Sequence, residues 1–197
     1  MNKLRFGFDL DNTIIDYNKA AYIYSRDNLP DKAYSIFELR NYLTNSGNKD
    51  SWTTAQSWLY TEGLKYAVLS PGVLDIFEYL LKRDYELVIL SHKTRFTPKR
   101  YGRSPLREFA KNWLNSSPLI NFFPGMNNIH FVDSLPKKVS LIKSLKILFY
   151  VDDLLKIFNS PEYPKNTVKS FIYQSQETLP KWLNKIDHFK EIEKYIK

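Results

Sequence analysis

Short apolar runs recur along the chain, and they constrain its fold more than any other feature. Each run is rich in Val, Ile, Leu, Phe or Tyr, and most do not alternate with polar residues. That pattern is typical of strands buried on both faces of a parallel sheet. We predict strands at residues 4–8, 86–90, 128–132, 147–151 and 168–173.

Helical patterns separate these runs. Residues 72–83 repeat apolar side chains at helical spacing, and residues 104–114 open with Ser and then Pro, a helix-start signal. We predict a third helix at 139–145 and a last amphipathic helix at 181–197. Strands that alternate with helices predict an α/β fold, a doubly wound (Rossmann-like) parallel sheet of about five strands.

The segment from 17 to 69 breaks this alternation. It contains three predicted helices and no convincing strand, so we interpret it as a small helical cap inserted into the sheet domain. The helices are expected near 17–29, 34–44 and 52–68. The predicted organisation is a core domain of residues 1–16 and 70–197 and a cap of residues 17–69.

Composition fits one buried core and excludes some kinds of site. The 197 residues are 43% hydrophobic, and the absence of cysteine excludes disulfides and thiolate metal sites. The net charge of +8 comes from scattered lysines, which favours a solvated surface over nucleic-acid binding. Neither a secretory signal nor an apolar run of about 18 residues is present, so we expect a cytoplasmic protein without a membrane segment.

Charged and polar residues follow the predicted strands. In an open α/β sheet, ligands bind at the carboxyl ends of the strands, so these side chains are expected to gather at one edge. Clustered carboxylates repel one another unless a cation compensates them, and Mg²⁺ prefers carboxylates together with water and phosphate oxygens. The residues concerned are Asp9, Asp11, Ser91, His92, Asp152 and Asp153, with Lys137 and Lys138 at the start of a helix.

Each of these features alone has an ordinary structural explanation. Asp-x-Asp is common in turns, paired acids often begin helices, and a Lys-Lys pair is usually solvated surface. Because they occur in order at successive strand ends, they support one another. The combination predicts a site for a metal and a phosphate.

Four segments resemble the motifs of the haloacid dehalogenase (HAD) superfamily. They are an apolar strand followed by Asp-x-Asp-x-Thr, a strand ending in Ser, a lysine that leads a helix, and a strand ending in paired acids. The matching residues are Phe8-Asp9-Leu10-Asp11-Asn12-Thr13, Val88-Ile89-Leu90-Ser91, Lys138 and Phe149-Tyr150-Val151-Asp152-Asp153. The resemblance spans roughly residues 4 to 175, and the helical segment falls where many members carry a cap.

The resemblance implies a role for each matched acid. Asp9 would be the nucleophile that forms an aspartyl phosphate, and Asp11 would protonate the leaving group and then activate water. Mg²⁺ would be held by Asp9, by the backbone carbonyl of Asp11 and by one acid of the last motif. Asp153 matches the usual ligand position, and Asp152 would lie in or next to the ligand set.

The phosphate would be held by Ser91 and Lys138, with Lys137 as the alternative lysine. We also predict two further phosphate-binding residues, Asn12 and His92. Asn12 lies in the turn after the nucleophile. For His92, packing near the site without contact to the substrate is an equal alternative. Dehalogenase members lack an acid at the position of Asp11, because a halide leaving group needs no proton. An acid there therefore favours phosphate chemistry.

The predicted function is hydrolysis of a small phosphorylated metabolite, such as a sugar phosphate or a nucleotide. Two related activities are alternatives: a phosphosugar mutase, which usually needs a larger closing cap, and a polynucleotide end phosphatase. A binding module that has lost turnover is a third alternative, and it is the least favoured because every motif position is filled. The sequence does not determine the oligomeric state.

Overall fold

The computed structural model describes residues 3–47 and 50–196; residues 1–2, 48–49 and 197, which the predicted ranges include, lie outside the described residues. The chain forms two compact units. The first consists of Met1–Ile14, Ser70–Lys93 and Pro118–Lys197, and the second of Ile15–Leu69 and Thr94–Ser117. The second unit thus contains a segment beyond the predicted cap range, and the role of 17–69 as a cap stays a prediction.

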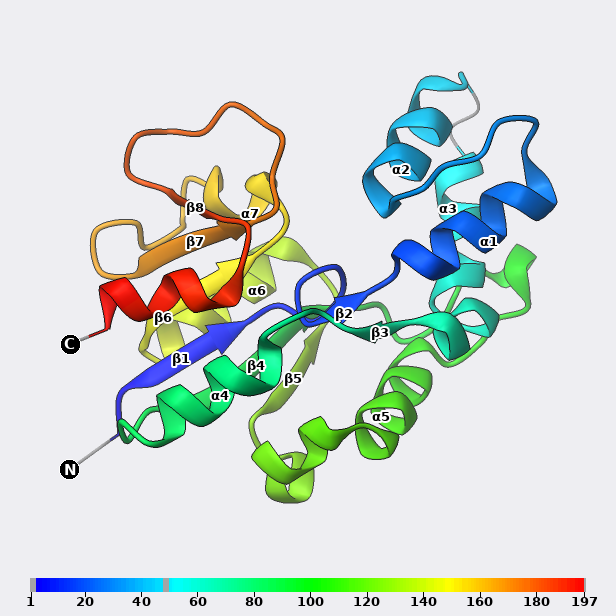
Figure 1. The fold of residues 1–197 in the computed structure, drawn as a ribbon. Helices are drawn as coiled ribbons and strands as arrows, with labels where there is room; N and C mark the ends of the chain where they lie inside the picture. The colour runs from blue at the N-terminus through cyan, green and yellow to red at the C-terminus, as the bar shows by residue number, and fades with distance from the viewer. Residues whose placement is uncertain (1–2, 48–49, 197) are drawn as a thin grey trace. The chain divides into compact units, whose positions relative to one another are not determined.

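A six-stranded parallel sheet forms the centre of the first unit (Figure 1). Its spatial order is β5-β4-β1-β6-β7-β8. The chain runs from β1 outward to β4 and β5, and then returns to the other side of β1 for β6, β7 and β8. Strand β1 therefore lies at the switch point of the sheet, where ligands bind in folds of this class. The strands are β1 Arg5–Phe8, β4 Glu86–His92, β5 Ile129–Val132, β6 Ile147–Asp152, β7 Lys169–Tyr173 and β8 Asn184–Ile186.

Five of these strands confirm the sequence prediction, and the sixth corrects it. The predicted amphipathic helix at 181–197 is wrong: this segment forms β8 and then the 3-10 helix η5 Phe189–Tyr195. Its apolar side chains pack on opposite faces of the sheet. Trp182 packs on Tyr163 on the face covered by α6, whereas Phe189 stacks on Tyr173 on the face covered by α4. A single helical stripe cannot reach both faces. Within η5, the apolar residues Phe189, Ile192 and Tyr195 are three positions apart, which fits the three residues per turn of a 3-10 helix.

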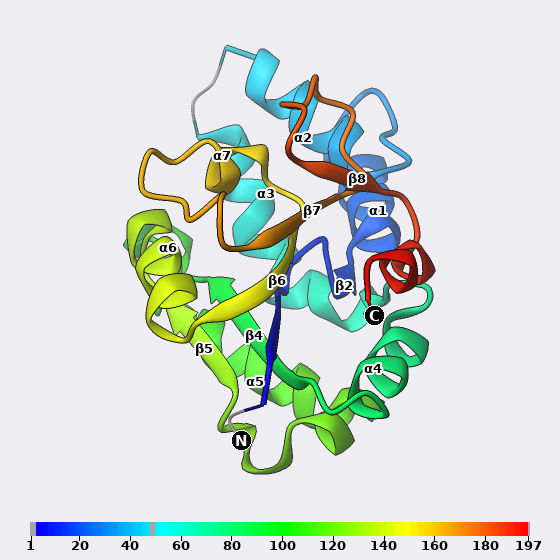
Figure 2. The ribbon, with the colours of Figure 1, turned by 90° about the vertical axis from the view of Figure 1, so that its left-hand side faces the viewer.

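Side chains alternate between the two faces of the sheet. Helix α4 (Val73–Leu81) and η5 cover one face, and helices α6 (Leu135–Ser144) and α7 (Leu155–Phe158) cover the other (Figure 2). On the α4 face, the ring of Phe6 stacks on Phe8 at 4.7 Å and on Phe149 at 5.1 Å between centroids. On the α6 face, Val139 and Ile142 pack in a buried cluster that includes Tyr150.

Helices dominate the second unit, as predicted for residues 17–69. The unit also contains a short antiparallel pair of two-residue strands, β2 and β3, which the sequence did not suggest, and helix α5. Its elements are β2 Ile15–Asp16, α1 Asn18–Asn28, α2 Ile36–Asn45, α3 Ser51–Leu59, η1 Glu62–Tyr66, β3 Val68–Leu69, η2 Lys99–Tyr101 and α5 Leu106–Ser116.

One predicted helix of this unit is divided. The range 52–68 forms α3, then η1 and then β3. A Cβ atom on Gly63 would lie 2.7 Å from the ring of Trp58, so the chain turns here at a residue without a side chain. Helix α2 begins as its sequence indicates, because Ser35 and Glu38 form a capping box.

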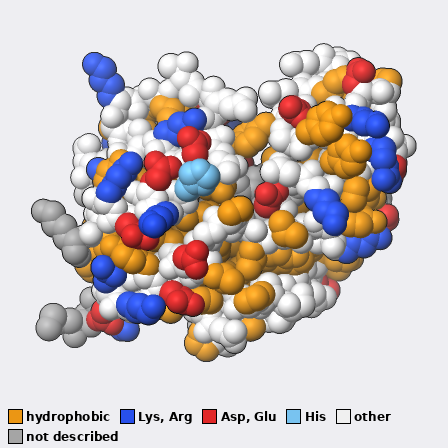
Figure 3. Space-filling model, in the orientation of Figure 1, with side chains coloured by type: hydrophobic (Ala, Val, Ile, Leu, Met, Phe, Trp, Pro, Cys, Tyr) orange, Lys and Arg blue, Asp and Glu red, His pale blue; other side chains and the backbone are white. Residues whose placement is uncertain are grey.

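The surface carries charges of both signs. On the face shown in Figure 3, Lys and Arg side chains are interspersed with Asp and Glu, which agrees with the scattered lysines of the sequence. None of the helices in the described parts of the chain is both long enough and apolar enough to cross a membrane.

Gly7 provides a stability test of the sheet. A Cβ atom at this position would lie 2.9 Å from Cδ2 of Tyr150 and 3.1 Å from Cγ2 of Ile147. We expect Gly7→Ala to lower the free energy of unfolding by about 1–3 kcal/mol through overpacking, measured by urea denaturation. Tyr150→Leu removes the ring that the new methyl group meets. The two costs should therefore be less than additive in the double variant, and additive costs would contradict the clash.

Candidate active site

Two acids stand in the loop that follows β1. The backbone N–H of Asp9 still donates to the carbonyl of Val151 at 2.8 Å, so Asp9 is fixed to the sheet beside β6. Asp9 and Asp11 are only 5% and 8% exposed. Asn12 then takes a left-handed conformation with φ of 61°, which Asn adopts more readily than most residues and which turns the chain away from the sheet. The loop thus holds two carboxylates at the switch point.

Lys138 connects these acids to β6. Its ammonium group pairs with Oδ1 of Asp9 and, at 2.8 Å, with Oδ2 of Asp152, and the residue is 1% exposed. Helix α6 presents it in the first turn. By contrast, the Lys137 side chain is 67% exposed and lies 3.6 Å from Asp133. Of the two candidate lysines, the structure brings Lys138 into the cluster.

The paired acids at the end of β6 differ in their surroundings. Asp152 is fully buried, and its carboxylate also accepts hydrogen bonds from the Tyr150 hydroxyl at 2.8 Å and from the Leu154 N–H at 3.0 Å. Asp153 is buried as well, and carboxylate oxygens of Asp9, Asp152 and Asp153 lie within 4.8 Å of one another. This group of hard oxygen donors suits a divalent cation such as Mg²⁺.

The cluster is electrostatically costly. Burial raises the pKa of Asp9 from 3.8 to about 7; Lys138 opposes this rise, and Asp152 and Asp11 add to it. Burial by itself would lower the pKa of Lys138, but the carboxylates of Asp152 and Asp9 outweigh it and raise that pKa above its usual 10.5. A divalent cation beside Asp9 would favour its ionised form. The surroundings of Asp9 therefore favour a positively charged ligand.

The end of β4 supplies the other side of the cluster. Ser91 is fully buried, and its Oγ lies 3.4 Å from Oδ2 of Asp11. The exposed His92 directs its ring elsewhere, with Nε2 3.2 Å from the carbonyl of Asp133, and desolvation of the ring lowers its pKa. Of the two, only Ser91 meets the acids directly.

Two residues of this cluster were placed near strand ends by the sequence but were given no role in the site. Lys93 is 3% exposed, and its ammonium group donates to Oδ1 of Asp11 at 2.9 Å. Tyr150 holds Asp152 from within β6. Both could have been found from strand geometry, because side chains two positions apart in a strand point to the same side. Lys93 shares a side with Ser91, and Tyr150 with Asp152.

Two buried polar atoms of the loop after Asp11 make no hydrogen bond to any described residue. They are Oδ1 of Asn12 and Oγ1 of Thr13. Buried polar atoms are nearly always satisfied, so each exception calls for an explanation, such as a catalytic role or a bound water or ion. A ligand near Asn12 stays a prediction, and Thr13 adds a buried hydroxyl in the same turn.

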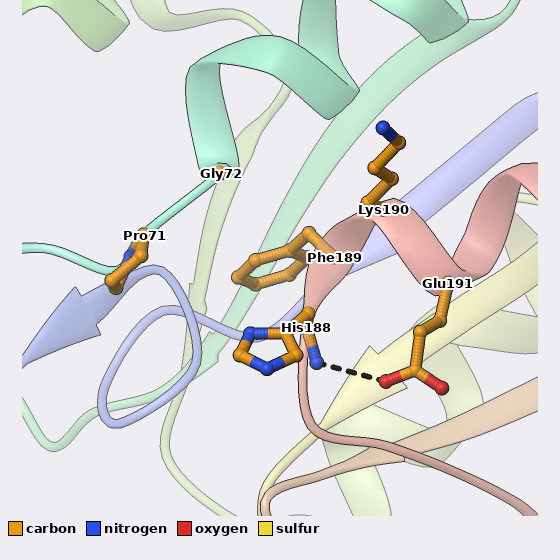
Figure 4. Close-up of a pocket in the computed structure, with 6 residues that line it drawn as sticks. All are labelled: Pro71, Gly72, His188, Phe189, Lys190 and Glu191. Carbon is orange, nitrogen blue, oxygen red and sulfur yellow. Dashed lines mark hydrogen bonds between the residues drawn. The ribbon is translucent and has the colours of Figure 1, made fainter.

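A pocket of about 550 Å³ lies elsewhere in the first unit, where α4 and η5 begin (Figure 4). Phe189 gives it an apolar wall, and the N–H of His188 donates to Oε1 of Glu191 at 3.0 Å. The lining residues are Pro71, Gly72, His188, Phe189, Lys190 and Glu191. None of the clustered acids lines this pocket.

Comparison with solved structures identifies the fold. No protein-family model matches the chain, and no curated protein matches it in sequence. A haloacid dehalogenase-like hydrolase from Streptococcus pneumoniae superposes with a TM-score of 0.66 at 15% identity, over 99% of each chain. A predicted phosphatase from Clostridium acetobutylicum superposes with a TM-score of 0.60 at 16% identity, over 99% of each chain. A predicted phosphoglycolate phosphatase from Haemophilus somnus superposes with a TM-score of 0.57 at 14% identity, over the whole of both chains. The chain has the HAD fold, which confirms the resemblance drawn from the motifs at the level of the fold.

The raised pKa of Asp9 predicts a pH-dependent loss of stability in cation-free protein. Between pH 4 and 7 the unfolded chain releases the Asp9 proton while the folded chain keeps it, so unfolding becomes easier as the pH rises. We expect urea denaturation in EDTA to show a lower free energy of unfolding at pH 7 than at pH 5. Asp9→Asn should reduce this difference. An equal difference in the variant would show that other groups cause it.

Proposed function

We propose that this chain, which has the HAD fold, is a Mg²⁺-dependent phosphatase that acts through an aspartyl phosphate on Asp9. One observation carries the proposal: Asp9, Asp152 and Asp153 converge at the switch point of the sheet, with Lys138 buried among them. If Lys138 served only a structural ion pair, a single carboxylate would be enough to neutralise its charge. Here Lys138 pairs with two of three converging carboxylates. The three acids therefore carry more negative charge than one ammonium group offsets, which suits a cation, and a phosphoryl group would complete the site.

In this proposal, a carboxylate oxygen of Asp9 attacks phosphorus, an O–P bond forms, and the bond to the leaving oxygen breaks. Asp11, which must carry a proton at this step, donates it to that oxygen, so that an alcohol leaves and the Asp11 carboxylate remains. Asp11 then takes a proton from water, the water oxygen attacks phosphorus, and inorganic phosphate and free Asp9 result. The position of Asp11 two residues after Asp9 supports this division of labour.

The cation would be held by the carboxylates of Asp9 and Asp153 and by the backbone carbonyl of Asp11. Asp152 would support them from the edge of the ligand set, because the Lys138, Tyr150 and Leu154 donors already engage its carboxylate. When bound, Mg²⁺ would offset negative charge on the phosphoryl group.

Phosphoryl oxygens would be bound by Lys138 and Ser91, with help from the turn at Asn12. Lys138 is rigidly placed, since two carboxylates hold its ammonium group. His92 remains a proposed contact with the substrate, and its exposed position at the end of β4 suits the part of the substrate beyond the phosphate.

The substrate that we propose is a small phosphorylated metabolite, a sugar phosphate or a nucleotide. The predicted phosphatases among the structural neighbours support this class. A mutase of the phosphosugar kind is less favoured because the predicted cap is small, and a binding module is less favoured because the acids and Lys138 are all in place. The absence of cysteine fits the reducing conditions of a cytoplasmic location.

Replacing the nucleophile tests the activity. Purified protein should hydrolyse p-nitrophenyl phosphate in Mg²⁺, and Asp9→Asn should lower turnover by about 10³-fold or more, because no aspartyl phosphate can form. EDTA should abolish turnover and added Mg²⁺ should restore it. The exposed Asp31 gives a matched control, and Asp31→Asn should keep full activity. Activity that survives Asp9→Asn or EDTA would refute this mechanism.

A second candidate function, removal of phosphate from polynucleotide ends, has one observation in its favour. Phe96 is 37% exposed, and the guanidinium groups of Arg95 and Arg103 lie 5.9 and 5.2 Å from the centroid of its ring. An aromatic ring flanked by cations can stack on a base while the cations bind phosphate.

Salt dependence separates the two candidates. A polynucleotide phosphatase should lose affinity for a 5′- or 3′-phosphorylated oligonucleotide steeply as salt rises, because counterions are released on binding. It should also lose affinity in Phe96→Ala. A metabolite phosphatase should prefer sugar phosphates or nucleotides, with KM nearly independent of salt.

A further inference from the structure

Lys93 is a buried cation that the proposed chemistry does not use. The side chain comes from the end of β4, and its backbone N–H donates to the carbonyl of Val132 at 3.0 Å, which continues the pairing with β5. The residue is therefore fixed at the edge of the sheet. Its ammonium group lies 2.9 Å from Oδ1 of Asp11, and both side chains are almost completely buried.

Ser91 in β4 and Lys93 directly after it contact the two oxygens of Asp11. Lys93 holds Oδ1, and the Ser91 hydroxyl lies 3.4 Å from Oδ2. The three acids that meet within 4.8 Å do not include Asp11. The carboxylate of Asp11 is thus drawn toward β4, while those of the other three acids converge on one another.

The charges of the cluster are consistent with this separation. Four buried carboxylates and two buried ammonium groups leave a formal charge of −2 when all are ionised, equal and opposite to that of one divalent cation. Without Lys93, a third uncompensated negative charge would stand beside the cation site. Asp11 would then gain by turning toward the cation, as carboxylates do.

We propose that Lys93 is a positioning residue, which holds the carboxylate of Asp11 for proton transfer and keeps it out of the ligand set of the cation. This inference rests on the proposed function, because it assigns Lys93 a part in the acid–base steps of Asp11. The ammonium group of Lys93 contacts the Asp11 carboxylate, so in this proposal Lys93 acts through Asp11.

The test separates the two chemical steps in Lys93→Met, a variant of similar length without the charge. p-Nitrophenolate is a good leaving group that needs little protonation, so a first-turnover burst of p-nitrophenol should change less than about 3-fold. Steady-state turnover depends on water activation by Asp11 and should fall by about 10²-fold. Acid-quenched Lys93→Met should therefore carry more phosphate on Asp9, detected by mass spectrometry, than the unaltered protein does.

A double variant tests whether Lys93 acts through Asp11. Asp11→Asn alone should show the same retained burst and slow turnover. Adding Lys93→Met to Asp11→Asn should cost less than 3-fold more, because the group that Lys93 positions is already gone. Multiplied losses, or a burst that falls as far as turnover, would overturn the proposal and leave Lys93 with a general structural role.

Cation binding gives a readout that does not depend on activity. Calorimetric titration with Mg²⁺ alone should show equal or tighter binding to Lys93→Met, since negative charge is added and Asp11 is free to approach the cation. Weaker binding would contradict the proposal. Lys82→Met, which removes an exposed lysine, is the control and should match the unaltered protein in every assay.

Formation of the aspartyl phosphate in the unaltered protein distinguishes failure of the proposed function from failure of this inference. If the unaltered protein forms no aspartyl phosphate, the proposed function fails first; if it does and Lys93→Met behaves like it, only this inference fails. Should Lys93→Met not fold, Lys93→Gln, which keeps a hydrogen-bond donor, takes its place in the same assays.

Discussion

The pairing of Lys138 with Asp9 and Asp152 is the interaction on which the site depends. A carboxylate buried at the end of a strand is costly unless a charge compensates it, and here one ammonium group serves carboxylates from two neighbouring strands. Lys138 thereby fixes the end of β1 to the end of β6. The same pairing leaves negative charge on the acids, because one cation cannot neutralise all of them. The arrangement is thus stable enough to fold and still favours a further cation.

The topology explains why these residues meet. Strand β1 lies between β4 and β6, so the loops that follow all three open at one edge. Each loop then contributes a different kind of group: carboxylates from β1 and β6, and a hydroxyl and a cation from β4. Helix α6 adds Lys138 because its first turn, capped by Ser134, begins at that edge. Segments far apart in the chain thus become one site at the strand ends and in the loops that follow them.

Much of this could be predicted from the sequence, because buried parallel strands have a strong local pattern and strand ends define the site in this fold. The five predicted strands and the gathering of Asp9, Ser91, Lys138 and Asp152 follow from those two rules. The predicted helix at 181–197 was wrong because periodicity at a spacing of three or four cannot separate one helix from a strand followed by a 3-10 turn. Lys93 was missed because a lysine three residues past the apolar run looks like surface, and only the continued pairing with β5 buries it.

The site and the core make opposite contributions to stability. Burial at the end of β1, together with the neighbouring carboxylates, raises the pKa of Asp9, so the cation-free fold is less stable at neutral than at acidic pH. The opposite face of the same strands carries the stacked rings of Phe6, Phe8 and Phe149, whose burial is among the most favourable that side chains provide. Because side chains alternate along a strand, β1 can place Phe6 and Phe8 in this aromatic layer while Gly7 leaves room for Tyr150, which holds Asp152. Burial of the aromatic layer therefore offsets the cost of burying charges at the strand ends. Strand β1 contributes to both, because Phe6 and Phe8 lie in the aromatic layer and Asp9 follows directly after the strand.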